Sequence, residues 1–508
     1  MEKKNILSDR LLIVVLFFFS IVFVFFNSKN SPLYLFNEWG DVNIYFSMGK
    51  GMMNGLVPYR DLFDHKGPFI FFIYGLAYLI SDSTFFGVYV LQCLALFINV
   101  LFAYKLSRLY FGSVLSFLTA ALYAVLLFNK SYYGGSAEEF TSVFITVSFY
   151  YFIFYFRDQR QQSSTNNLQM FIHGLMFGLT FLSKLSVCVF WLPILLAIGI
   201  VLICKQQYKT LFKFASYFLL GFAATLLPFV VYFGLNGALN DSYFGYITFN
   251  SLYAEFNPDF ELLKKIGSHF VKLLVFNYIS FPLTLLGLFL LTFTKKYVDN
   301  FIYRLGILLS FIFSFVIICL SKYIMTYAHI GIYVYAIFGM IFLFGYIENY
   351  VKTSIQVVVF ALSFILVLGI GIHNKDFFGQ DKNCLLRKEE CNYMQKEFAE
   401  IINNEKHPTL LNIGLDFGIY TKANILPSYK YFFYPNIPYH IYPEIRDYQM
   451  ALIEKKEPMF VVIGDKSAFY NEYSKLPALK TNYTLIDTFT QGISTEYDNQ
   501  VFLYKRKD

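Results

Sequence analysis

The sequence is poor in charged residues. Asp, Glu, Lys and Arg make up 15% of its 508 residues, whereas about 25% is usual in a soluble protein. Hydrophobic residues make up 57% of the chain and aromatic residues 21%. This balance excludes an ordinary soluble globular protein. Because several apolar runs approach the ~20 residues that cross a bilayer, the sequence predicts an all-α polytopic membrane protein.

Motifs for soluble cofactors and for metals are also missing. The sequence contains no GxGxxG fingerprint, no CxxC pair and no Cys/His zinc spacing. We therefore predict no cofactor and no metal site, although a divalent ion held by Asp64, His65 and a glutamate stays open. The net charge of +7 is attributed to lysines and arginines in membrane loops, so no nucleic-acid partner is expected. Cys384 and Cys391 are the cysteines outside the apolar runs, and whether they form a disulfide stays open.

The apolar runs predict about eleven membrane-spanning helices. When the N-terminus is placed in the cytoplasm, every predicted inner loop carries Lys or Arg, as the positive-inside rule requires. The short run 69–80 follows a charged stretch, and we expect it to lie at the membrane interface, with a further span as the alternative. The predicted spans are 11–27, 84–104, 113–128, 138–156, 168–183, 186–204, 212–234, 270–293, 301–321, 325–347 and 355–373.

This topology leaves three sizeable segments outside the membrane, 28–68, 235–269 and 374–508. We predict a transmembrane module over 1–373 and a small extracytoplasmic α/β domain over 374–508. We expect the three outer segments to form a roof over a cavity on the outer face of the plasma membrane. The last segment shows strand patterns at 407–414, 458–464, 483–489 and 500–506, and a helix pattern at 386–404.

The first outer segment concentrates ionisable residues beside an apolar run. Asp41 and Tyr45 are four residues apart, so they share a face where the chain is helical. Asp64, His65 and Lys66 come directly before the run of Phe and Ile. A carboxylate can take a proton from an attacking hydroxyl, and a neighbouring cation can stabilise a departing phosphate. At headgroup level, this combination predicts an enzyme that acts on a substrate linked to a lipid phosphate.

The motifs D-V-N-I-Y at 41–45 and G-L-V-P-Y-R-D-L-F-D-H-K-G-P at 55–68 resemble the first outer loop of a known group. This group is the bacterial membrane glycosyltransferases of the C-type (GT-C) fold, which include protein O-mannosyltransferase-like enzymes and lipid A aminoarabinose transferases. The resemblance implies that Asp41 is the essential acidic residue and Tyr45 its partner. It also implies that Lys66 contacts the phosphate of the lipid carrier.

The resemblance further implies an inverting transfer of a hexose or pentose from a polyprenyl-phosphate donor. The acceptor would be a hydroxyl of a cell-surface glycan, lipid or teichoic-type polymer. In the family a carboxylate stands directly before Lys-Pro-Pro, whereas this chain has Asp64-His65-Lys66-Gly67-Pro68. Whether Asp64 or His65 takes the role of that carboxylate stays open at this stage.

Other candidates stand at the expected outer ends of later spans. Glu138 and Glu139 either assist catalysis, as in the family, or only begin a helix that Ser136 caps. Lys184 either contacts the phosphate or extends its ammonium to water. Tyr327 and His329, which follow Lys322 and Tyr323, either bind substrate or belong to an aromatic belt.

Arg60 is a further candidate for holding the phosphate, because a guanidinium can bind it through two hydrogen bonds. Its alternative is a local pair with Asp61 or a contact with the C-terminal segment. Two other functions share the lipid-phosphate chemistry: a transporter or flippase of lipid-linked saccharides, and a polymerase or ligase. A transporter normally shows repeated span patterns and charges within the spans, and the sequence shows little of either.

Overall fold

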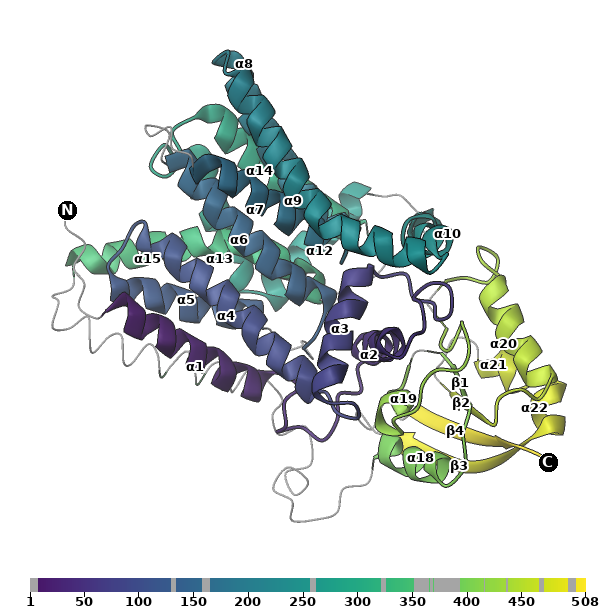
Figure 1. Cartoon of the computed structure of the whole chain (residues 1–508). Helices are drawn as coiled ribbons and strands as arrows, with labels where there is room; N and C mark the ends of the chain where they lie inside the picture. Colours follow the sequence, from purple (N-terminus) through teal and green to yellow (C-terminus); the bar gives the residue numbers. More distant parts are fainter. Residues whose placement is uncertain are drawn as a thin grey trace. The chain divides into compact units, whose positions relative to one another are not determined.

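The computed structural model describes most of the chain and divides it into two compact units (Figure 1). The helical unit comprises Met1–Ser31, Leu91–Phe229 and Asp259–Gly379. The mixed unit comprises Pro32–Val90, Val230–Pro258 and Gln380–Asp508. The described residues are 8–128, 134–157, 165–255, 262–320, 326–350, 365, 369, 393–414, 416–434, 437–465, 470–491 and 499–508.

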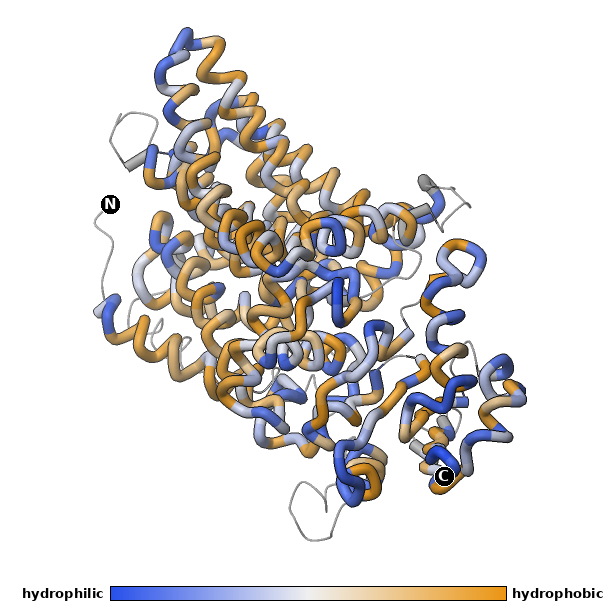
Figure 2. Tube along the Cα trace, turned by 45° about the vertical axis from the view of Figure 1, so that its right-hand side comes forward, coloured by the Kyte–Doolittle hydropathy of each residue, from blue (hydrophilic) through white to orange (hydrophobic). Residues whose placement is uncertain are grey.

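Long apolar helices make up the helical unit. Within the described residues, seven helices are long and apolar enough to cross a membrane, or eight if one bent pair counts as a span. Figure 2 shows hydrophobic residues along most of their length. The protein is therefore a multi-span helical membrane protein, as predicted. The helices are α1 (Asp9–Asn27), α4 (Phe86–Arg108), α6 (Ala137–Arg157), the 3-10 helix η1 (Leu185–Phe190) continued by α8 (Trp191–Cys204), α9 (Tyr208–Leu235), α14 (Phe301–Cys319), and the 3-10 helix η3 (Thr326–Tyr335) continued by α15 (Ala336–Tyr350).

Two further predicted spans are helices of less than full membrane length. They are α5 (Ser113–Leu127) and α7 (Thr165–Phe181), of 15 and 17 residues. The predicted span 355–373 falls almost wholly outside the described residues. The run 69–80 forms α3 (Pro68–Ile80), a helix of 13 residues that is too short to cross a bilayer upright.

The single span predicted over 270–293 is broken in the structure. Helices α12 (Leu262–Phe276) and α13 (Ser280–Phe293) meet at 115°. Pro282 supplies the physical reason, because a proline has no N–H to bond the preceding turn and its ring collides with the carbonyl there. It is tolerated in the first turn of α13, where no such bond is needed.

Glycines allow α13 to approach the continued helix η3–α15 closely. A Cβ on Gly287 of α13 would lie 1.9 Å from the carbonyl oxygen of Tyr335, and one on Gly339 of α15 would lie 2.4 Å from that of Leu283. Without a side chain, the two backbones pack directly, which is a usual way for membrane helices to associate.

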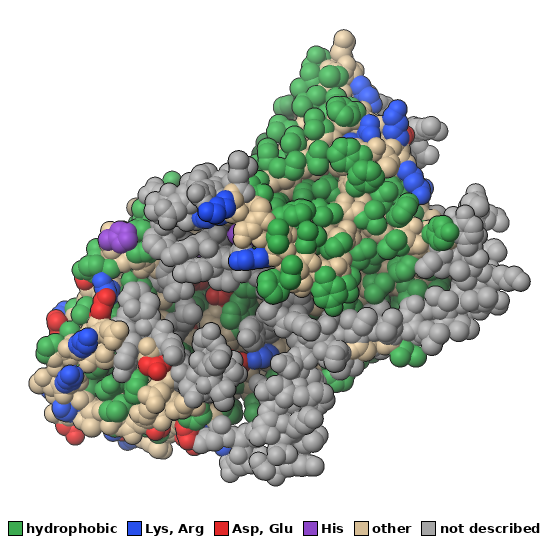
Figure 3. Space-filling model, turned by 180° about the vertical axis from the view of Figure 1, so that it is seen from behind, with side chains coloured by type: hydrophobic (Ala, Val, Ile, Leu, Met, Phe, Trp, Pro, Cys, Tyr) green, Lys and Arg blue, Asp and Glu red, His purple; other side chains and the backbone are tan. Residues whose placement is uncertain are grey.

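The outer surface of α9 carries exposed apolar side chains such as Phe212, and Figure 3 shows a broad hydrophobic face of this kind. Such a face fits contact with lipid tails.

The mixed unit combines short helices with a four-stranded sheet. Its strands are β1 (Leu410–Ile413), β2 (Phe460–Gly464), β3 (Tyr483–Gln491) and β4 (Asn499–Arg506), in the order β1-β2-β4-β3. β1 and β2 are parallel and the other pairs are antiparallel. All four predicted strands are thus confirmed. The helices are α2 (Gly40–Met53), α3, α10 (Leu239–Tyr243), the π-helix η2 (Phe244–Thr248), α11 (Phe249–Glu255), α18 (Met394–Asn403), α19 (Ile419–Lys422), α20 (Glu444–Glu454), α21 (Tyr470–Tyr473) and α22 (Pro477–Asn482).

Phe63 joins the three chain segments of the mixed unit. Its ring lies 4.9 Å from that of Phe249 and 5.3 Å from that of Tyr431, each measured between centroids. Its backbone N–H donates to the carbonyl of Lys430 at 2.9 Å. Asn250 also donates to the carbonyl of His65 at 2.7 Å. The three outer segments therefore pack together in the mixed unit, for the parts that the structure describes, and the roof over a cavity stays a prediction.

Candidate functional site

Helix α2 presents Asp41 and Tyr45 on one face. Asp41 stands in the first turn, where the partial positive charge of the helix N-terminus favours a carboxylate. The hydroxyl of Tyr45 lies 3.5 Å from Oδ2 of Asp41, at the outer limit of a hydrogen bond. Tyr45 is buried and packs edge-on against Tyr74 of α3. The predicted pairing of Asp41 with Tyr45 on one helix face is confirmed.

A tight turn brings the chain from α2 to α3. Gly55 and Tyr59 both have positive φ, of 86° and 69°, which marks the sharp reversals in this stretch. The buried Tyr59 donates its hydroxyl to the carbonyl of Lys66 at 2.6 Å. This bond fixes the backbone at Lys66 against the turn, directly before α3 begins at Pro68.

Asp64, His65 and Lys66 form a chain of polar contacts. Nδ1 of His65 lies 3.2 Å from Oδ1 of Asp64, and Nε2 lies 3.2 Å from Nζ of Lys66. Because an ammonium can only donate, Nε2 must accept and the ring proton belongs on Nδ1, toward the carboxylate. Nζ of Lys66 lies 5.9 Å from the ring centroid of Tyr45. The structure thus brings this chain together with the Asp41–Tyr45 pair.

The charges in this cluster act on one another. Burial raises the pKa of Asp64, but the adjacent His65 and Lys66 more than offset this effect and hold it below the ordinary value. Burial and the charge of Lys66 together lower the pKa of His65, although Asp64 and Asp41 act in the opposite direction. At neutral pH the cluster therefore contains an ionised Asp64 and a neutral His65. His65 contacts Lys66 directly, whereas Asp64 lies on the opposite side of the imidazole ring.

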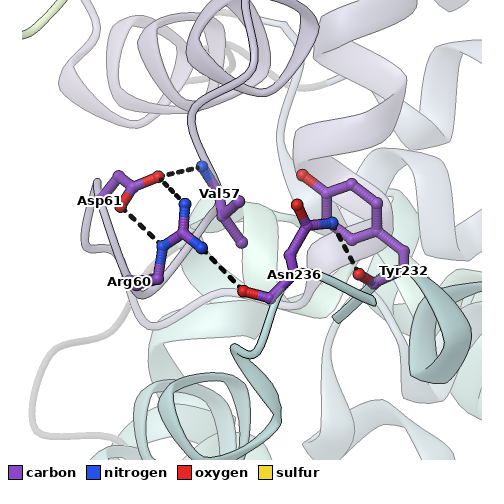
Figure 4. Close-up of polar contacts among 5 residues, drawn as sticks. All are labelled: Val57, Arg60, Asp61, Tyr232 and Asn236. Atoms are coloured by element: carbon purple, nitrogen blue, oxygen red, sulfur yellow. Dashed lines mark hydrogen bonds and ion pairs between the residues drawn. The ribbon is translucent and has the colours of Figure 1, made fainter. Parts of the chain in front are cut away.

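Arg60 is engaged by its own loop (Figure 4). Its Nε and Nη2 donate to the two carboxylate oxygens of Asp61 at 2.8 and 2.7 Å, and Nη1 donates to the carbonyl of Asn236 at 2.7 Å. The side-chain hydrogen bonds from Arg60 lower the pKa of Asp61. The local pair, which was the alternative prediction for Arg60, is confirmed. It connects the first loop to the segment that follows α9.

In the helical unit, Glu139 accepts several hydrogen bonds. Both of its carboxylate oxygens accept from Nε2 of Gln92 at 3.0 Å, and Oε2 also accepts from the N–H of Gly135 at 2.7 Å. Its own N–H donates to Oγ of Ser136 at 3.0 Å, so the predicted cap is confirmed. Oε1 of Gln92 accepts in turn from Ser28 at 2.8 Å.

Sequence reasoning overlooked Gln92. The available signal was a polar side chain inside the apolar run of α4, since polar groups at membrane depth are costly and usually have a task. Asn99 stands seven residues later on the same helix face and donates to Oγ of Ser142 at 3.0 Å. Together they form a buried polar seam between α4 and α6.

The other predicted residues of the helical unit fall into two places. Nζ of Lys184, at the start of η1, donates to Oε1 of the buried Glu138, so these two candidates form an ion pair. Tyr327 and His329 lie on η3, where His329 is fully buried with its ring centroid 6.5 Å from that of His269. Lys322, Tyr323, Cys384 and Cys391 lie outside the described residues.

The candidates are therefore divided between the two units. The mixed unit holds the Asp41 cluster, which we define as Asp41, Tyr45, Asp64, His65 and Lys66. The helical unit holds the Glu138–Lys184 pair and the Glu139–Gln92 network. Within the described residues, no three His, Cys, Asp or Glu side chains stand where they could hold a metal ion.

Comparison with known proteins identifies the fold. Residues 65–233 match a family model described as dolichyl-phosphate-mannose-protein mannosyltransferase. No curated protein matches the sequence. The structure resembles ArnT from Cupriavidus metallidurans, solved with undecaprenyl phosphate, at a TM-score of 0.60 and 11% identity over 97% of each chain.

It also resembles the Archaeoglobus fulgidus oligosaccharyltransferase, solved with zinc and sulfate. The TM-score is 0.54 and the identity 15%, over 97% of this chain and 73% of that one. The oligosaccharyltransferase AglB from the same archaeon, solved with an inhibitory peptide and dolichol phosphate, gives a TM-score of 0.52 at 11% identity over 98% of this chain and 74% of that one. The chain thus has the fold of the GT-C membrane glycosyltransferases, and residues 65–233 resemble the protein mannosyltransferases within that group.

Proposed function

We propose that the protein is a glycosyltransferase that takes a sugar from a polyprenyl-phosphate donor. The acceptor is a hydroxyl of a cell-surface glycan, lipid or teichoic-type polymer at the outer face of the plasma membrane. The GT-C fold supports the general activity. Two of its structural neighbours were solved with undecaprenyl phosphate or dolichol phosphate, which supports the donor class.

The observation that carries the proposal is the juxtaposition of Asp41 with Lys66. Tyr45 contacts both, through its hydroxyl to the carboxylate and through its ring to the ammonium. The cluster thus places a carboxylate and an ammonium around the side chain of Tyr45. Transfer of a sugar from a lipid phosphate needs both groups. The carboxylate can accept the proton that leaves the acceptor, and the ammonium can stabilise the negative charge that builds on the phosphate.

In the proposed reaction, the oxygen of the acceptor hydroxyl attacks the anomeric carbon of the sugar. The bond between that carbon and the phosphate oxygen breaks, and its electron pair stays on the phosphate. The hydroxyl proton passes to the carboxylate of Asp41. Attack from the side opposite the phosphate inverts the anomeric carbon.

Lys66 stabilises the developing charge on the phosphate by its ammonium group. His65, neutral at pH 7, accepts a hydrogen bond from that ammonium and limits its rotation. The carboxylate of Asp64 lies beside the other ring nitrogen of His65. We assign the role of the carboxylate before Lys-Pro-Pro to the Asp64–His65 pair acting together, because His65 makes the contact and Asp64 supplies the charge. The Glu138–Lys184 pair is proposed as a second, separate contributor to acceptor or phosphate binding.

The test is to incubate the purified, full-length protein with a panel of polyprenyl-phosphate sugars and an extract of cell-surface acceptors. Mass spectrometry then identifies the donor that is consumed. Asp41→Asn should abolish consumption and leave expression and thermal stability intact. Asp447→Asn is the matched control, since that carboxylate is exposed on α20 and accepts from Tyr439. Normal turnover by the Asp41 variant would refute the assignment of the base.

A further inference from the structure

Helix α2 has a second polar face, on the side opposite Asp41 and Tyr45. Asn43, Ser47 and Lys50 recur at intervals of four and three residues, which places them along one side of a helix. All three are buried, with exposed fractions of 0%, 1% and 3%. Their neighbour is segment 416–424 of the α/β domain, more than 360 residues away along the chain and within the same mixed unit.

Two side-chain contacts join α2 to this segment. Oγ of Ser47 donates to Oδ2 of the buried Asp416 at 3.1 Å, and the N–H of Gly418 donates to Oδ1 of the same carboxylate at 2.8 Å. Nζ of Lys50 donates to Oδ1 of Asn424. The amide group of Asn424 donates onward to Asp82 at 3.1 Å. The helix is thus held at two successive turns.

Gly418 allows the segment to approach the helix. Its φ is +87°, and a Cβ at this position would lie 2.5 Å from Oδ1 of Asn43 and 2.5 Å from Cε1 of Phe36. Both the backbone conformation and the space therefore exclude a side chain. Such a close approach leaves little freedom for α2 to rotate or slide against the α/β domain.

We propose that segment 416–424 positions α2, and that Asp416, acting through Ser47, is a positioning residue for the Asp41–Tyr45 pair. This inference rests on the proposed function. A helix moves as a rigid element, so a displacement on the Ser47 side moves the Asp41 side by a similar distance. Displacing a catalytic group by about 1 Å can cost on the order of 100-fold in rate.

The surroundings of Asp416 make its contact sensitive to protonation. Burial raises the pKa of Asp416 to about 6, although the hydrogen bonds from Gly418 and Ser47 lower it. The titratable group that couples to it is Tyr420, whose hydroxyl donates to the carbonyl of Leu410 at 2.8 Å. The side chain of α2 that contacts Asp416 is Ser47, which is uncharged. The positively charged Lys50 stands about one helical turn after Ser47.

The first test compares rates of transfer by full-length variants. Ser47→Ala and Gly418→Ala should lower kcat about tenfold, with the KM for the donor changed by less than about threefold, because the phosphate contact at Lys66 is retained. Asp416→Asn keeps a carbonyl acceptor for Ser47 and should retain more activity than Asp416→Ala. Ser242→Ala is the matched control, because that exposed hydroxyl donates only within its own turn, to Leu239.

The second test does not depend on activity. Hydrogen exchange of the α2 backbone amides, read by mass spectrometry, should become faster in the Ser47 and Gly418 variants and stay unchanged in the Ser242 control. Unchanged exchange would overturn the inference, as would faster exchange with an unaltered kcat. If the wild-type protein transfers no sugar from any donor, the proposed function fails. The exchange experiment alone then decides whether the segment holds α2.

Discussion

Nε2 of His65 lies 3.2 Å from Nζ of Lys66, and the other ring nitrogen lies 3.2 Å from Asp64. An imidazole thus connects a carboxylate to an ammonium over a stretch of three consecutive residues. The carboxylate acts on the ring by its charge, and the ring contacts the cation. This arrangement lets the buried charge of Asp64 act on Lys66 through the imidazole of His65.

Because His65 lies between Asp64 and Lys66, we predict that substitutions of His65 and of Asp64 weaken donor binding through the same contact. Asp64→Asn removes the charge that keeps the imidazole oriented, and His65→Ala removes the acceptor for the ammonium. We expect both to raise the KM for the donor about tenfold, in line with the loss of one hydrogen bond to a charged group, roughly 1.5 kcal/mol. Donor titrations of the two single variants and the double variant measure this effect. If the two losses add fully, instead of overlapping, the residues do not act as a chain.

Lys66→Met should have a larger effect on donor binding. The substitution keeps the length of the side chain and removes the charge, so we expect the KM for the donor to rise between about 10-fold and 100-fold, corresponding to 1.5–3 kcal/mol for a charged hydrogen bond. Steady-state kinetics with a fixed acceptor measure the change. Lys430→Met offers a matched control, since its ammonium pairs with Asp241 at 3.7 Å, a partly exposed contact. Equal effects of the two variants would argue against a phosphate contact at Lys66.

Arg60→Ala should affect the loop more than the chemistry. Its guanidinium is partly exposed and spans from Asp61 to the carbonyl of Asn236. Exposed ion pairs of this kind contribute about 0.2–1 kcal/mol. We expect a small fall in thermal stability and a change in kcat of less than about threefold. Scanning fluorimetry and the transfer assay together test this, and a loss of donor binding like that of Lys66→Met would show that Arg60 holds phosphate instead.

Gln92→Leu should be strongly destabilising. The side chain donates to both carboxylate oxygens of the buried Glu139, and its removal leaves that carboxylate short of two hydrogen bonds. Losing a hydrogen bond to a buried charged group costs about 1.5–3 kcal/mol. The melting temperature in detergent should fall by several degrees. The double variant Gln92→Leu/Glu139→Gln, which also removes the charge, should recover part of the loss, and no recovery would show that Gln92 matters through packing alone.

The buried Asp416 predicts how the stability of the folded protein depends on pH. Its pKa is raised from 3.8 to about 6, so the folded state takes up a proton more readily than the unfolded state. The resulting stability is fully present below pH 4 and is lost as the pH rises through about 6. Between pH 5 and pH 7 this linkage amounts to about 1 kcal/mol.

The corresponding measurement is the stability of the full-length protein across this range. The wild type should lose stability from pH 5 to pH 7 relative to Asp416→Asn, which has no group to titrate at this position. Parallel curves for the two proteins would show that Asp416 does not titrate in this range.

Much of the site was predictable because it is local in sequence. A spacing of four residues was enough to pair Asp41 with Tyr45, since helix geometry fixes which residues share a face. The cap from Ser136 to Glu139 was likewise local. The bend between α12 and α13 was also marked in the sequence, by Pro282, but a hydropathy window averages over such a break.

By itself, the sequence determined the membrane class, most of the spans, the four strands of the α/β domain and the pairing of Asp41 with Tyr45. These follow from composition, periodicity and close spacing, which act within a few turns of the chain. Only the tertiary structure decided that Gln92 supports Glu139, that Lys184 pairs with Glu138 and that Asp416 reaches Ser47. These partners are separated by tens to hundreds of residues, and burial is what couples them. A polar group removed from water must find a partner in space, and no local pattern states which one it will be.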